Sequence, residues 1–167
     1  MKLVLTVRKR DLIVRSGKVG VISDTHGLVR AEAMTALKGC EIILHAGDIG
    51  KPEVLDSLET IAPVIAIRGN NDRGSWAKKL PDILNLRING LGIYVIHNVH
   101  ELESSPGDDF RLVVSGHSHQ PSAITRGGVL YLNPGSAGPR RFKLPVAVAR
   151  LQVRGKRVRA KIIEIKA

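Results

Sequence analysis

The 167-residue sequence contains a single cysteine, Cys40, so no disulfide bond can form within the chain. Unpaired thiols are typical of reducing compartments, and we therefore expect a cytoplasmic protein. No apolar run approaches the ~20 residues that a membrane-spanning helix needs. The first residues carry their arginines after the apolar part, which is unlike a secretory signal. These absences argue against a disulfide scaffold, a secreted protein and a membrane partner.

Aromatic residues are also scarce, since the chain has two Phe, two Tyr and one Trp. The formal net charge is nevertheless +11, and it is concentrated at the two ends. Residues 1–17 carry +4 and residues 140–167 carry +9, whereas residues 18–139 carry −2. Proteins that bind nucleic acid usually combine basic patches with aromatic side chains for stacking. Nucleic acid stays an open alternative as a partner but is not favoured, because a solvated cationic surface explains the charge equally well.

The pattern of apolar residues predicts an α/β protein. Apolar residues make up 43% of the chain, enough for a sizeable core. Strands and helices alternate through residues 18–67, an order typical of parallel strands with helices on the sheet faces. Hairpin signals follow at Asn89-Gly90, Gly127-Gly128 and Arg154-Gly155. The predicted strands are 18–23, 41–45, 63–67, 83–88, 93–97, 111–115, 123–126, 129–132, 145–153 and 157–163, and the predicted helices are 29–38 and 52–59.

We divide the chain into a basic N-terminal extension, residues 1–16, and a single domain, residues 17–167. The strand-rich second half favours a sandwich of two sheets over one doubly wound sheet. The extension could form an extra edge strand or a flexible basic arm, or reflect a misassigned start. Because it holds none of the candidate site residues, we expect its deletion to leave catalysis unchanged.

Polar residues follow five of the predicted strands, in positions where loops commonly carry function. They lie in the patterns Asp24-Thr25-His26, Gly47-Asp48, Gly69-Asn70-Asn71-Asp72, His97 and Gly116-His117-Ser118-His119. Taken singly, such an Asp often caps a helix, a Gly-Asp pair often forms a turn, and a lone His often lies in the core. Taken together at one sheet edge, the imidazoles, carboxylates and amide favour a site for a divalent metal such as Mn, Fe, Ni or Zn. We expect extended backbone to turn both side chains of the Asp24/His26 and His117/His119 pairs to the same side.

The ordered set DxH, GD, GN, H and GHxH resembles the signature of the calcineurin-like metallophosphoesterase superfamily. The segments GVISDTHG, LHAGD, RGNND, SGHSHQP and YLNPGS resemble in particular its small, single-domain YfcE-like phosphodiesterase group. The likeness spans roughly residues 18–150. It implies an α/β fold, namely a four-layer α-β-β-α sandwich of two mixed β-sheets flanked by helices, which agrees with the predicted strands.

Carried over residue by residue, the resemblance implies a centre of two divalent metal ions. The first ion is expected on Asp24, His26, Asp48 and His119, and the second on Asp48, Asn70, His97 and His117. Asp48 would bridge the ions, and a hydroxide shared between them would attack phosphorus in line. We expect manganese, with nickel, iron, zinc or magnesium as alternatives, because this mixed nitrogen and oxygen set accepts several ions.

The sequence departs from the family pattern at Asn71, where most members have a histidine that assists the leaving group or contacts phosphate. An asparagine amide can donate a hydrogen bond but cannot transfer a proton near neutral pH. We predict a catalytic role for Asn71 as a donor, and we name His100 as a second catalytic candidate that could face substrate or solvent. His45 is interpreted as a residue of the core or of the layer behind the ligands.

All seven candidate ligands are present, so we favour an enzyme: a divalent-metal-dependent phosphodiesterase acting on a small phosphodiester. A non-catalytic scaffold is one alternative, because a eukaryotic retromer subunit resembles this fold and has a degraded metal site. A nuclease or nucleic-acid-processing factor is another, favoured by the terminal charge and disfavoured by the few aromatic residues. Neither the natural substrate nor the oligomeric state follows from the sequence.

Overall fold

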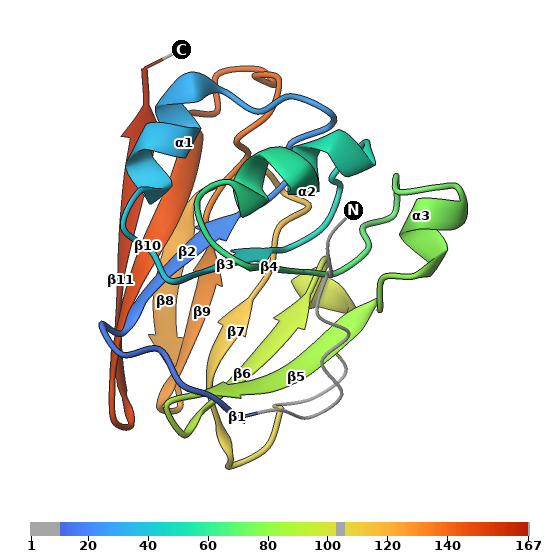
Figure 1. Cartoon of the computed structure of the whole chain (residues 1–167). Coiled ribbons are helices and arrows are strands. Elements are labelled where there is room, and N and C mark those ends of the chain that lie inside the picture. The colour runs from blue at the N-terminus through green and yellow to red at the C-terminus, as the bar shows by residue number, and fades with distance from the viewer. Residues whose placement is uncertain (1–10, 103–105, 167) are drawn as a thin grey trace.

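The computed structural model of the chain describes residues 11–102 and 106–166, and its strands form two mixed sheets (Figure 1). The six-stranded sheet has the order β1 (Asp11–Leu12), β5 (Ile83–Ile88), β6 (Leu91–Ile96), β7 (Phe110–Val114), β9 (Val129–Asn133) and β8 (Ser122–Arg126). The five-stranded sheet has the order β11 (Arg157–Ile165), β10 (Val146–Arg154), β2 (Lys18–Ile22), β3 (Ile42–His45) and β4 (Val64–Ala66). The helices are α1 (Ala31–Leu37), α2 (Pro52–Glu59), α3 (Ser75–Lys78) and the 3-10 turn η1 (Val99–Glu101). None of these described helices has the length and apolar character needed to cross a membrane.

The predicted α/β sandwich is confirmed, with layers in the order helix, sheet, sheet, helix. The two sheets share one core between them, and α1 and α2 cover the outer face of the five-stranded sheet (Figure 1), where Leu37 and Leu55 are fully buried. The layer over the six-stranded sheet is thinner, since η1 contributes Val99, which packs against Val113 and Val129. Most of the helical covering therefore lies on one side of the molecule.

The parallel strands β2, β3 and β4 are joined by α1 and α2, as the alternating pattern predicts. In β2, Val21 packs into the core between the sheets and Ile22 packs toward the helices, which explains the continuous apolar run. Gly39 follows α1 with a φ of 86°, and Pro52 begins α2 where a missing N–H is tolerated. The parallel pairing directs the carboxyl ends of these strands to one edge.

Two of the three predicted hairpin turns are confirmed, and the third is shifted by one residue. Asn89 and Gly90 have φ values of 51° and 83°, the geometry that a two-residue turn between antiparallel strands requires. In the last hairpin Arg154 pairs with Arg157, so the turn consists of Gly155 and Lys156 rather than Arg154 and Gly155. The other predicted strands and helices end within two residues of the observed ones.

Residues 11–16 pack onto the six-stranded sheet. Asp11–Leu12 pairs in parallel with β5, and Val14 is 1% exposed within the core between the sheets. The Val14 N–H donates to Asn89 Oδ1 and Asn89 Nδ2 donates to the Val14 carbonyl, both at 2.8 Å. This part of the basic extension therefore includes an edge strand, one of the alternatives left open by the sequence. The rest of the extension, residues 1–10, lies outside the described residues.

Candidate metal centre

The loops after β2, β3, β4, β6 and β7 meet at one edge of the sandwich and are cross-linked through their main chains. The Asp24 N–H donates to the Gly47 carbonyl at 3.0 Å, and the Gly116 N–H donates to the His97 carbonyl at 2.9 Å. The loop after β4 joins them, because the Asn71 N–H donates to Asp48 Oδ1 at 2.9 Å. This framework brings the five polar sequence patterns to one place.

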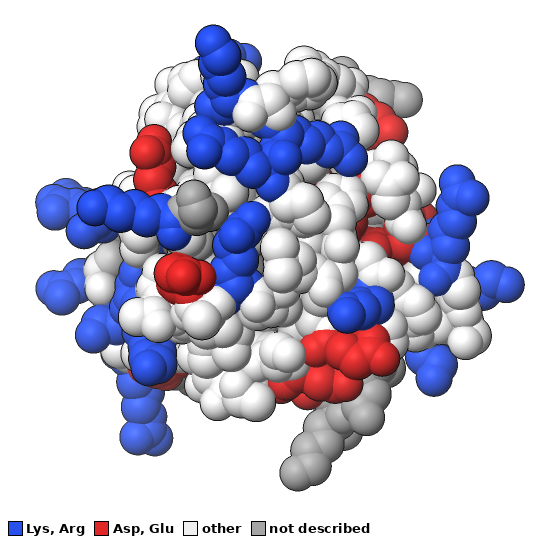
Figure 2. Space-filling view, turned by 90° about the horizontal axis from the view of Figure 1, so that it is seen from above, with Lys and Arg blue, Asp and Glu red and all other residues white. Residues whose placement is uncertain are grey.

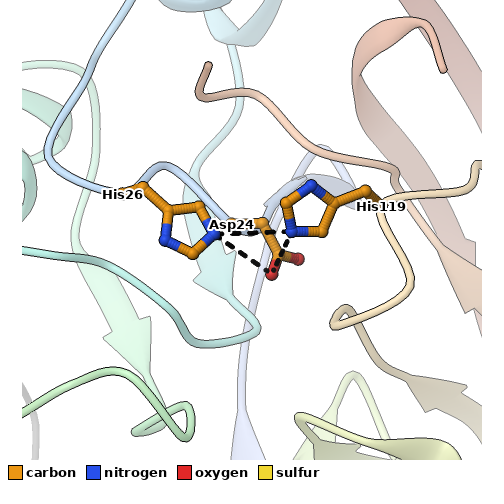
Figure 3. Close-up of side chains that lie close together, drawn as sticks. All are labelled: Asp24, His26 and His119. Carbon is orange, nitrogen blue, oxygen red and sulfur yellow. Dashed lines mark hydrogen bonds and ion pairs between the residues drawn. The ribbon is translucent and has the colours of Figure 1, made fainter. Parts of the chain in front are cut away.

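Asp24 lies at the centre of a first group of ligand atoms. Its Oδ1 is 3.3 Å from His119 Nε2 and 3.9 Å from His26 Nε2. The two imidazole nitrogens are 3.4 Å apart, and Figure 3 shows their rings on either side of the Asp24 carboxylate. Asp48 Oδ2 is 3.8 Å from His26 Nε2, so the four residues predicted for the first ion lie together.

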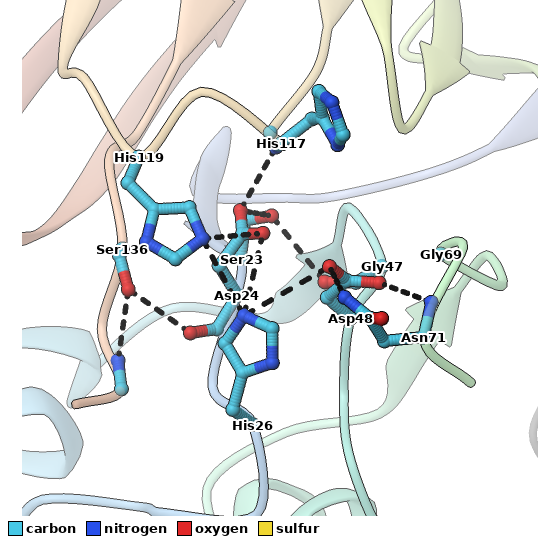
Figure 4. Close-up of polar contacts among 12 residues, drawn as sticks. Ser23, Asp24, His26, Gly47, Asp48, Gly69, Asn71, His117, His119 and Ser136 are labelled. Carbon is cyan, nitrogen blue, oxygen red and sulfur yellow. Dashed lines mark hydrogen bonds and ion pairs between the residues drawn. The ribbon is translucent and has the colours of Figure 1, made fainter. Parts of the chain in front are cut away.

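Asp48 also borders a second group. His97 Nε2 is 3.3 Å from Asp48 Oδ2 and 3.9 Å from Asp24 Oδ1, so these three buried residues could hold an ion by themselves. Asn70 and His117 are exposed at the rim, where Asn70 Oδ1 is 3.3 Å from His117 Nδ1. The His117 and His97 ring centroids are 5.3 Å apart, although Figure 4 shows the His117 ring pointing away from the His26–His119 pair. The second predicted set is thus gathered more loosely than the first.

Several buried atoms of this cluster have no hydrogen-bond partner among the described residues: Asp24 Oδ1, His97 Nε2 and His119 Nδ1. His97 Nδ1 lies 2.7 Å from the Ala46 carbonyl and donates to it, which leaves the Nε2 lone pair directed at Asp48 and Asp24. Buried lone pairs that face one another are costly unless a cation lies between them. The donor set therefore fits divalent metal ions, and a main-chain partner for the far ring nitrogen is typical of metal-bound histidines.

The backbone at the ligands differs from the sequence-based expectation. Five of the seven candidate ligands have φ between 45° and 70°, in the left-handed region: Asp24, His26, Asp48, His117 and His119. The expected extended backbone at the two i, i+2 pairs is therefore wrong, because tight loops rather than strands carry these residues. Such conformations cost roughly 1–3 kcal/mol each and tend to cluster at functional sites.

The pKa values of the two carboxylates reflect their neighbours. Burial acts to raise the pKa of Asp48, but the His97 ring and the two Asn71 N–H groups outweigh it and hold this pKa well below its usual range. At Asp24 burial is likewise outweighed, chiefly by His119, so its pKa is lowered. Both groups are therefore ionised near neutral pH, as metal ligands must be.

The pKa values of two imidazoles, those of His97 and His26, are shifted in opposite directions. Burial acts to lower the pKa of His97, but the adjacent Asp48 carboxylate and the Ala46 carbonyl raise it overall. At His26 burial prevails over the attraction of Asp48, and the pKa is lowered. The centre therefore contains one imidazole that favours the proton and one that favours its neutral, ligating form.

His45 lies behind the ligands, as the sequence suggests, and is completely buried. Its Nδ1 accepts from the Gly47 N–H at 3.1 Å, so the proton is on Nε2, which donates to Thr25 Oγ1 at 3.0 Å. Thr25 in turn donates to the Ile49 carbonyl at 2.8 Å. Burial lowers the pKa of His45 to about 3. A neutral His45 therefore ties together the loops that carry Asp24 and Asp48.

The two candidate catalytic residues lie differently from the ligands. Asn71 Nδ2 donates to Asp48 Oδ2 at 2.9 Å, so its amide is directed at the carboxylate (Figure 4). His100 lies exposed on η1 and lines a cavity of about 640 Å³ with Tyr131 and Gln120. None of the seven candidate ligands lines that cavity, so the structure does not bring His100 to them.

Sequence reasoning gave no role to three polar residues that hold the ligand loops. Asp72 is buried and accepts from the N–H groups of Gly50 and Gly69, each at 2.9 Å. Ser23 Oγ donates to Asp24 Oδ2 at 2.6 Å, and Ser136 Oγ donates to the Asp24 carbonyl at 3.0 Å (Figure 4). The only sequence signal for them is their place inside the quoted motifs.

Comparison with known proteins gives a consistent family. A model of the calcineurin-like phosphoesterase superfamily domain matches residues 18–156. A protein of Methanothermobacter thermautotrophicus described as "Probable metallophosphoesterase" is 34% identical over 160 residues, which cover 87% of this chain and 91% of that protein.

Solved structures with the same fold include proteins with different names. An archaeal phosphodiesterase has a TM-score of 0.72 and 24% identity, covering 87% of this chain and 99% of its own. The phosphoesterase YfcE of E. coli has a TM-score of 0.64 and 25% identity, and the match covers 80% of this chain and 87% of YfcE. Vps29 of Entamoeba histolytica complexed with Zn²⁺ has a TM-score of 0.69 and 19% identity, and the match covers 88% of this chain and 98% of Vps29. At such identities the archaeal phosphodiesterase and Vps29 support the fold alone.

Proposed function

This chain belongs to the calcineurin-like phosphoesterase superfamily, and from that membership we propose that it is a divalent-metal-dependent phosphodiesterase. The resemblance noted in the sequence, including that to the YfcE-like group, is confirmed by the family match and by the likeness to YfcE. The observation that carries the proposal is the convergence of two buried carboxylates and three imidazoles, in which Asp24 Oδ1 and His97 Nε2 are buried without a hydrogen-bond partner among the described residues.

We assign the ligands as two sets that share Asp48: Asp24, His26, Asp48 and His119, and Asp48, Asn70, His97 and His117. The distances from Asp48 Oδ2 to His26 and His97, 3.8 and 3.3 Å, support a bridging role. A carboxylate offers about four acceptor sites, and the two N–H groups of Asn71 take one on each oxygen. Two sites thus remain for metal ions, with Asn71 fixing the orientation of the carboxylate.

When bound, two divalent ions would supply Lewis acidity toward the phosphoryl oxygens and a hydroxide nucleophile near neutral pH. The chain contributes ionised carboxylates and imidazoles whose far nitrogens are held in place, as His97 is by the Ala46 carbonyl. We expect manganese as the active ion, with nickel, iron, zinc or magnesium as alternatives.

The charge lining the cavity beside the second ligand group supports a diester over a monoester. A cavity of about 660 Å³ borders Asn70, His97 and His117. Its single arginine, Arg68, is paired with Asp82 through two hydrogen bonds of 2.9 and 3.0 Å. The lining also includes carboxylates and has no unpaired cationic side chain among the described residues. A singly charged diester suits this surrounding better than a doubly charged monoester does.

Asn71 and His100 are the proposed candidates for assisting the leaving group. The Asn71 amide would have to exchange its bond to Asp48 for one to the leaving oxygen, and His100 lines a separate cavity. General-acid assistance is typically worth ~10²–10⁴-fold. We therefore expect activated aryl diesters to react much faster than alkyl esters.

A non-catalytic scaffold of the same fold is the alternative that the likeness to Vps29 keeps open. The complete set of seven family ligand positions favours an enzyme, because a scaffold has no need to retain them. A nuclease is the other alternative. We further propose a small phosphodiester as substrate and the cytoplasm as location, the latter because the one thiol, Cys40, has no partner for a disulfide.

The proposal is tested by hydrolysis of bis(4-nitrophenyl) phosphate and 4-nitrophenyl phosphate by protein stripped with chelator and reloaded with single metal ions. The proposal predicts no turnover when stripped, recovery with Mn²⁺ and faster turnover of the diester. Lys78→Gln, on the exposed side of α3, is a matched control that should behave as wild type. Metal binding without hydrolysis of either ester would favour the scaffold, and a faster monoester reaction would overturn the diester preference.

A further inference from the structure

The outer face of the five-stranded sheet is covered by α1 at the C-terminal end of β11, where Ile163 and Ile165 pack into the helix-side core, but it is left open along the first part of that strand. In that strand Val158, Ala160 and Ile162 pack against the core between the sheets. Successive side chains of a strand point to opposite faces, so the residues that alternate with these three point outward. They are Arg157, Arg159 and Lys161, and all are exposed.

The neighbouring strands continue this pattern. In β10, Leu151 and Val153 face the core, so Arg150 and Arg154 point outward. In β2 the first residue, Lys18, is exposed beside them. We call this surface the basic face: Lys18, Arg150, Arg154, Arg157, Arg159 and Lys161.

The strand register places like charges directly opposite each other on the basic face. Arg150 pairs with Lys161, and Arg154 pairs with Arg157. Within the described part of the chain, none of the six side chains takes part in an ion pair with a carboxylate. Like charges opposite one another in antiparallel strands are destabilising. The fold therefore carries a charge cost here that no ion pair offsets among the described residues.

Structural roles account for only part of this surface. Arg150 donates to the carbonyls of Ala36 and Lys38, at 2.8 and 2.7 Å, and so caps the end of α1. Charged residues on the edge strand β11 discourage pairing with another sheet. That reason does not extend to β10 and β2, which are internal strands. A stabilising ion-pair network needs both signs of charge, so the basic face, which has only positive charge, cannot be explained in that way.

The basic face lies at the opposite end of the sheet from the candidate metal centre. Its Lys18 begins β2, whereas Asp24 follows the end of that strand. Figure 2 shows Lys and Arg side chains along the left side of the molecule, the side on which β10 and β11 lie in Figure 1. A small substrate in the metal centre would therefore not contact this face.

We propose that the basic face binds the phosphate backbone of a nucleic acid duplex. Cations about 6.6–6.8 Å apart along β11, and one strand spacing apart across the sheet, form a flat array for a regularly charged polyanion. Single strands are bound largely by aromatic stacking, and the six residues include no aromatic side chain. An anionic membrane would call for apolar anchors, and none of the exposed large apolar side chains lies on β2, β10 or β11.

The test measures binding of a fluorescent 20-base-pair RNA duplex and the matching DNA duplex by anisotropy, in chelator so that hydrolysis is suppressed. With four to five phosphate contacts, affinity should fall roughly 10²–10³-fold between 50 and 200 mM salt. The triple variant Arg157→Gln/Arg159→Gln/Lys161→Gln should bind more weakly and lower the slope of log K against log salt by about 3. Its thermal midpoint should equal or exceed that of wild type.

A charge-matched control distinguishes binding by the basic face from an effect of the protein's net charge. The variant Lys78→Gln/Lys79→Gln/Arg87→Gln loses the same charge from α3 and its C-cap and from β5, and should keep the affinity and slope of wild type. Equal loss in both variants would overturn the proposal in favour of net charge alone. Tighter binding of the single strand, or binding of phosphatidylserine vesicles without duplex binding, would overturn it as well. Because binding is measured without metal, the outcome does not depend on the proposed hydrolysis.

Discussion

Asp48 touches both groups of ligand atoms, with its Oδ2 3.8 Å from His26 Nε2 and 3.3 Å from His97 Nε2. Asp48→Asn keeps the shape of the side chain but removes its charge, so we predict that both ions are lost. Asn70→Ala should weaken mainly the second site, because Asn70 lies 3.3 Å from His117 at the exposed rim. Metal per chain, measured by elemental analysis after dialysis, checks both. An Asp48→Asn protein that retained two ions would refute the bridging assignment.

His45 makes the stability of the metal-free protein depend on pH. Its pKa is about 3 when folded and 6.5 in the unfolded chain, so protons bind more strongly to the unfolded state. The stabilisation is complete above pH 6.5 and is lost as the pH falls toward 3. Between pH 6 and 5 the free energy of unfolding should fall by about 1 kcal/mol per unit more than in His45→Gln. Urea unfolding in chelator measures this, and equal slopes would show that His45 does not titrate in this way.

Asn71 affects how strongly turnover depends on the leaving group. Its amide donates to Asp48 and cannot transfer a proton, so departure of a poor leaving group goes largely unassisted. Asn71→His should narrow the difference between aryl and alkyl diesters, provided that the ring does not capture a metal. The measurement is the slope of log kcat/KM against leaving-group pKa for both proteins. A wild-type slope as shallow as that of the variant would point to another acid, with His100 as the first candidate.

The grouping of the candidate ligands could be predicted from the sequence and its family resemblance, but their backbone conformation could not. The resemblance to the family implies Asp24, His26 and His119 as one group, and these side chains do lie together. Their positive φ values depend on loops fixed by distant partners, such as the hydrogen bond from the Asp24 N–H to the Gly47 carbonyl. A short-range pattern contains no information on such partners.

At the scale of the elements, the loop after β7 fits closely against the loop after β2. A Cβ added at Gly116 would overlap Ser23 Oγ and Asp24 Oδ2. We predict that Gly116→Ala displaces Asp24, abolishes metal binding and costs roughly 1–3 kcal/mol of stability. Gly90→Ala is the control, since its Cβ meets nothing within 4 Å and only its φ of 83° is strained, so it should lose about 1 kcal/mol and keep its metal. Metal content and urea unfolding of both variants check this, and normal metal binding by Gly116→Ala would contradict it.

Regular elements with clear periodicity could be predicted from the sequence, and short ones could not. The strands other than β1 and the helices α1 and α2 have apolar patterns long enough to recognise, and Asn89-Gly90 marks its turn by residue type. The four-residue α3 and the three-residue η1 are too short to show a helical period. The shifted turn at Gly155 arises because Arg154 extends the pairing of β10, which neighbouring residues do not reveal.

The structure of the N-terminal extension was also hard to predict from its sequence. Its basic composition gives no sign of an apolar contact, yet Val14 is buried in the core and makes two hydrogen bonds to Asn89. The expectation that deletion of residues 1–16 leaves catalysis unchanged therefore does not extend to stability. Deletion through residue 16 would take away a buried side chain that contributes roughly 1.5–3 kcal/mol.

At the scale of the whole molecule, the chain separates two kinds of charge. Carboxylates and imidazoles gather at the carboxyl ends of the parallel strands, whereas the basic face occupies the other end of the five-stranded sheet. The net charge of +11 therefore says little about the metal centre, whose cavity is lined by several carboxylates. Composition alone could not reveal this separation, because it depends on which strands pair.

The central claim is that the cluster around Asp48 is a two-metal phosphodiesterase centre. The most direct measurement is turnover of an aryl phosphodiester as stripped protein is titrated with Mn²⁺, with bound metal counted in the same samples. We predict no turnover without metal, and a rise that saturates at two ions per chain in wild type and is absent in Asp48→Asn. Full turnover in excess chelator with no bound metal, or saturation with metal and no hydrolysis, would contradict the account.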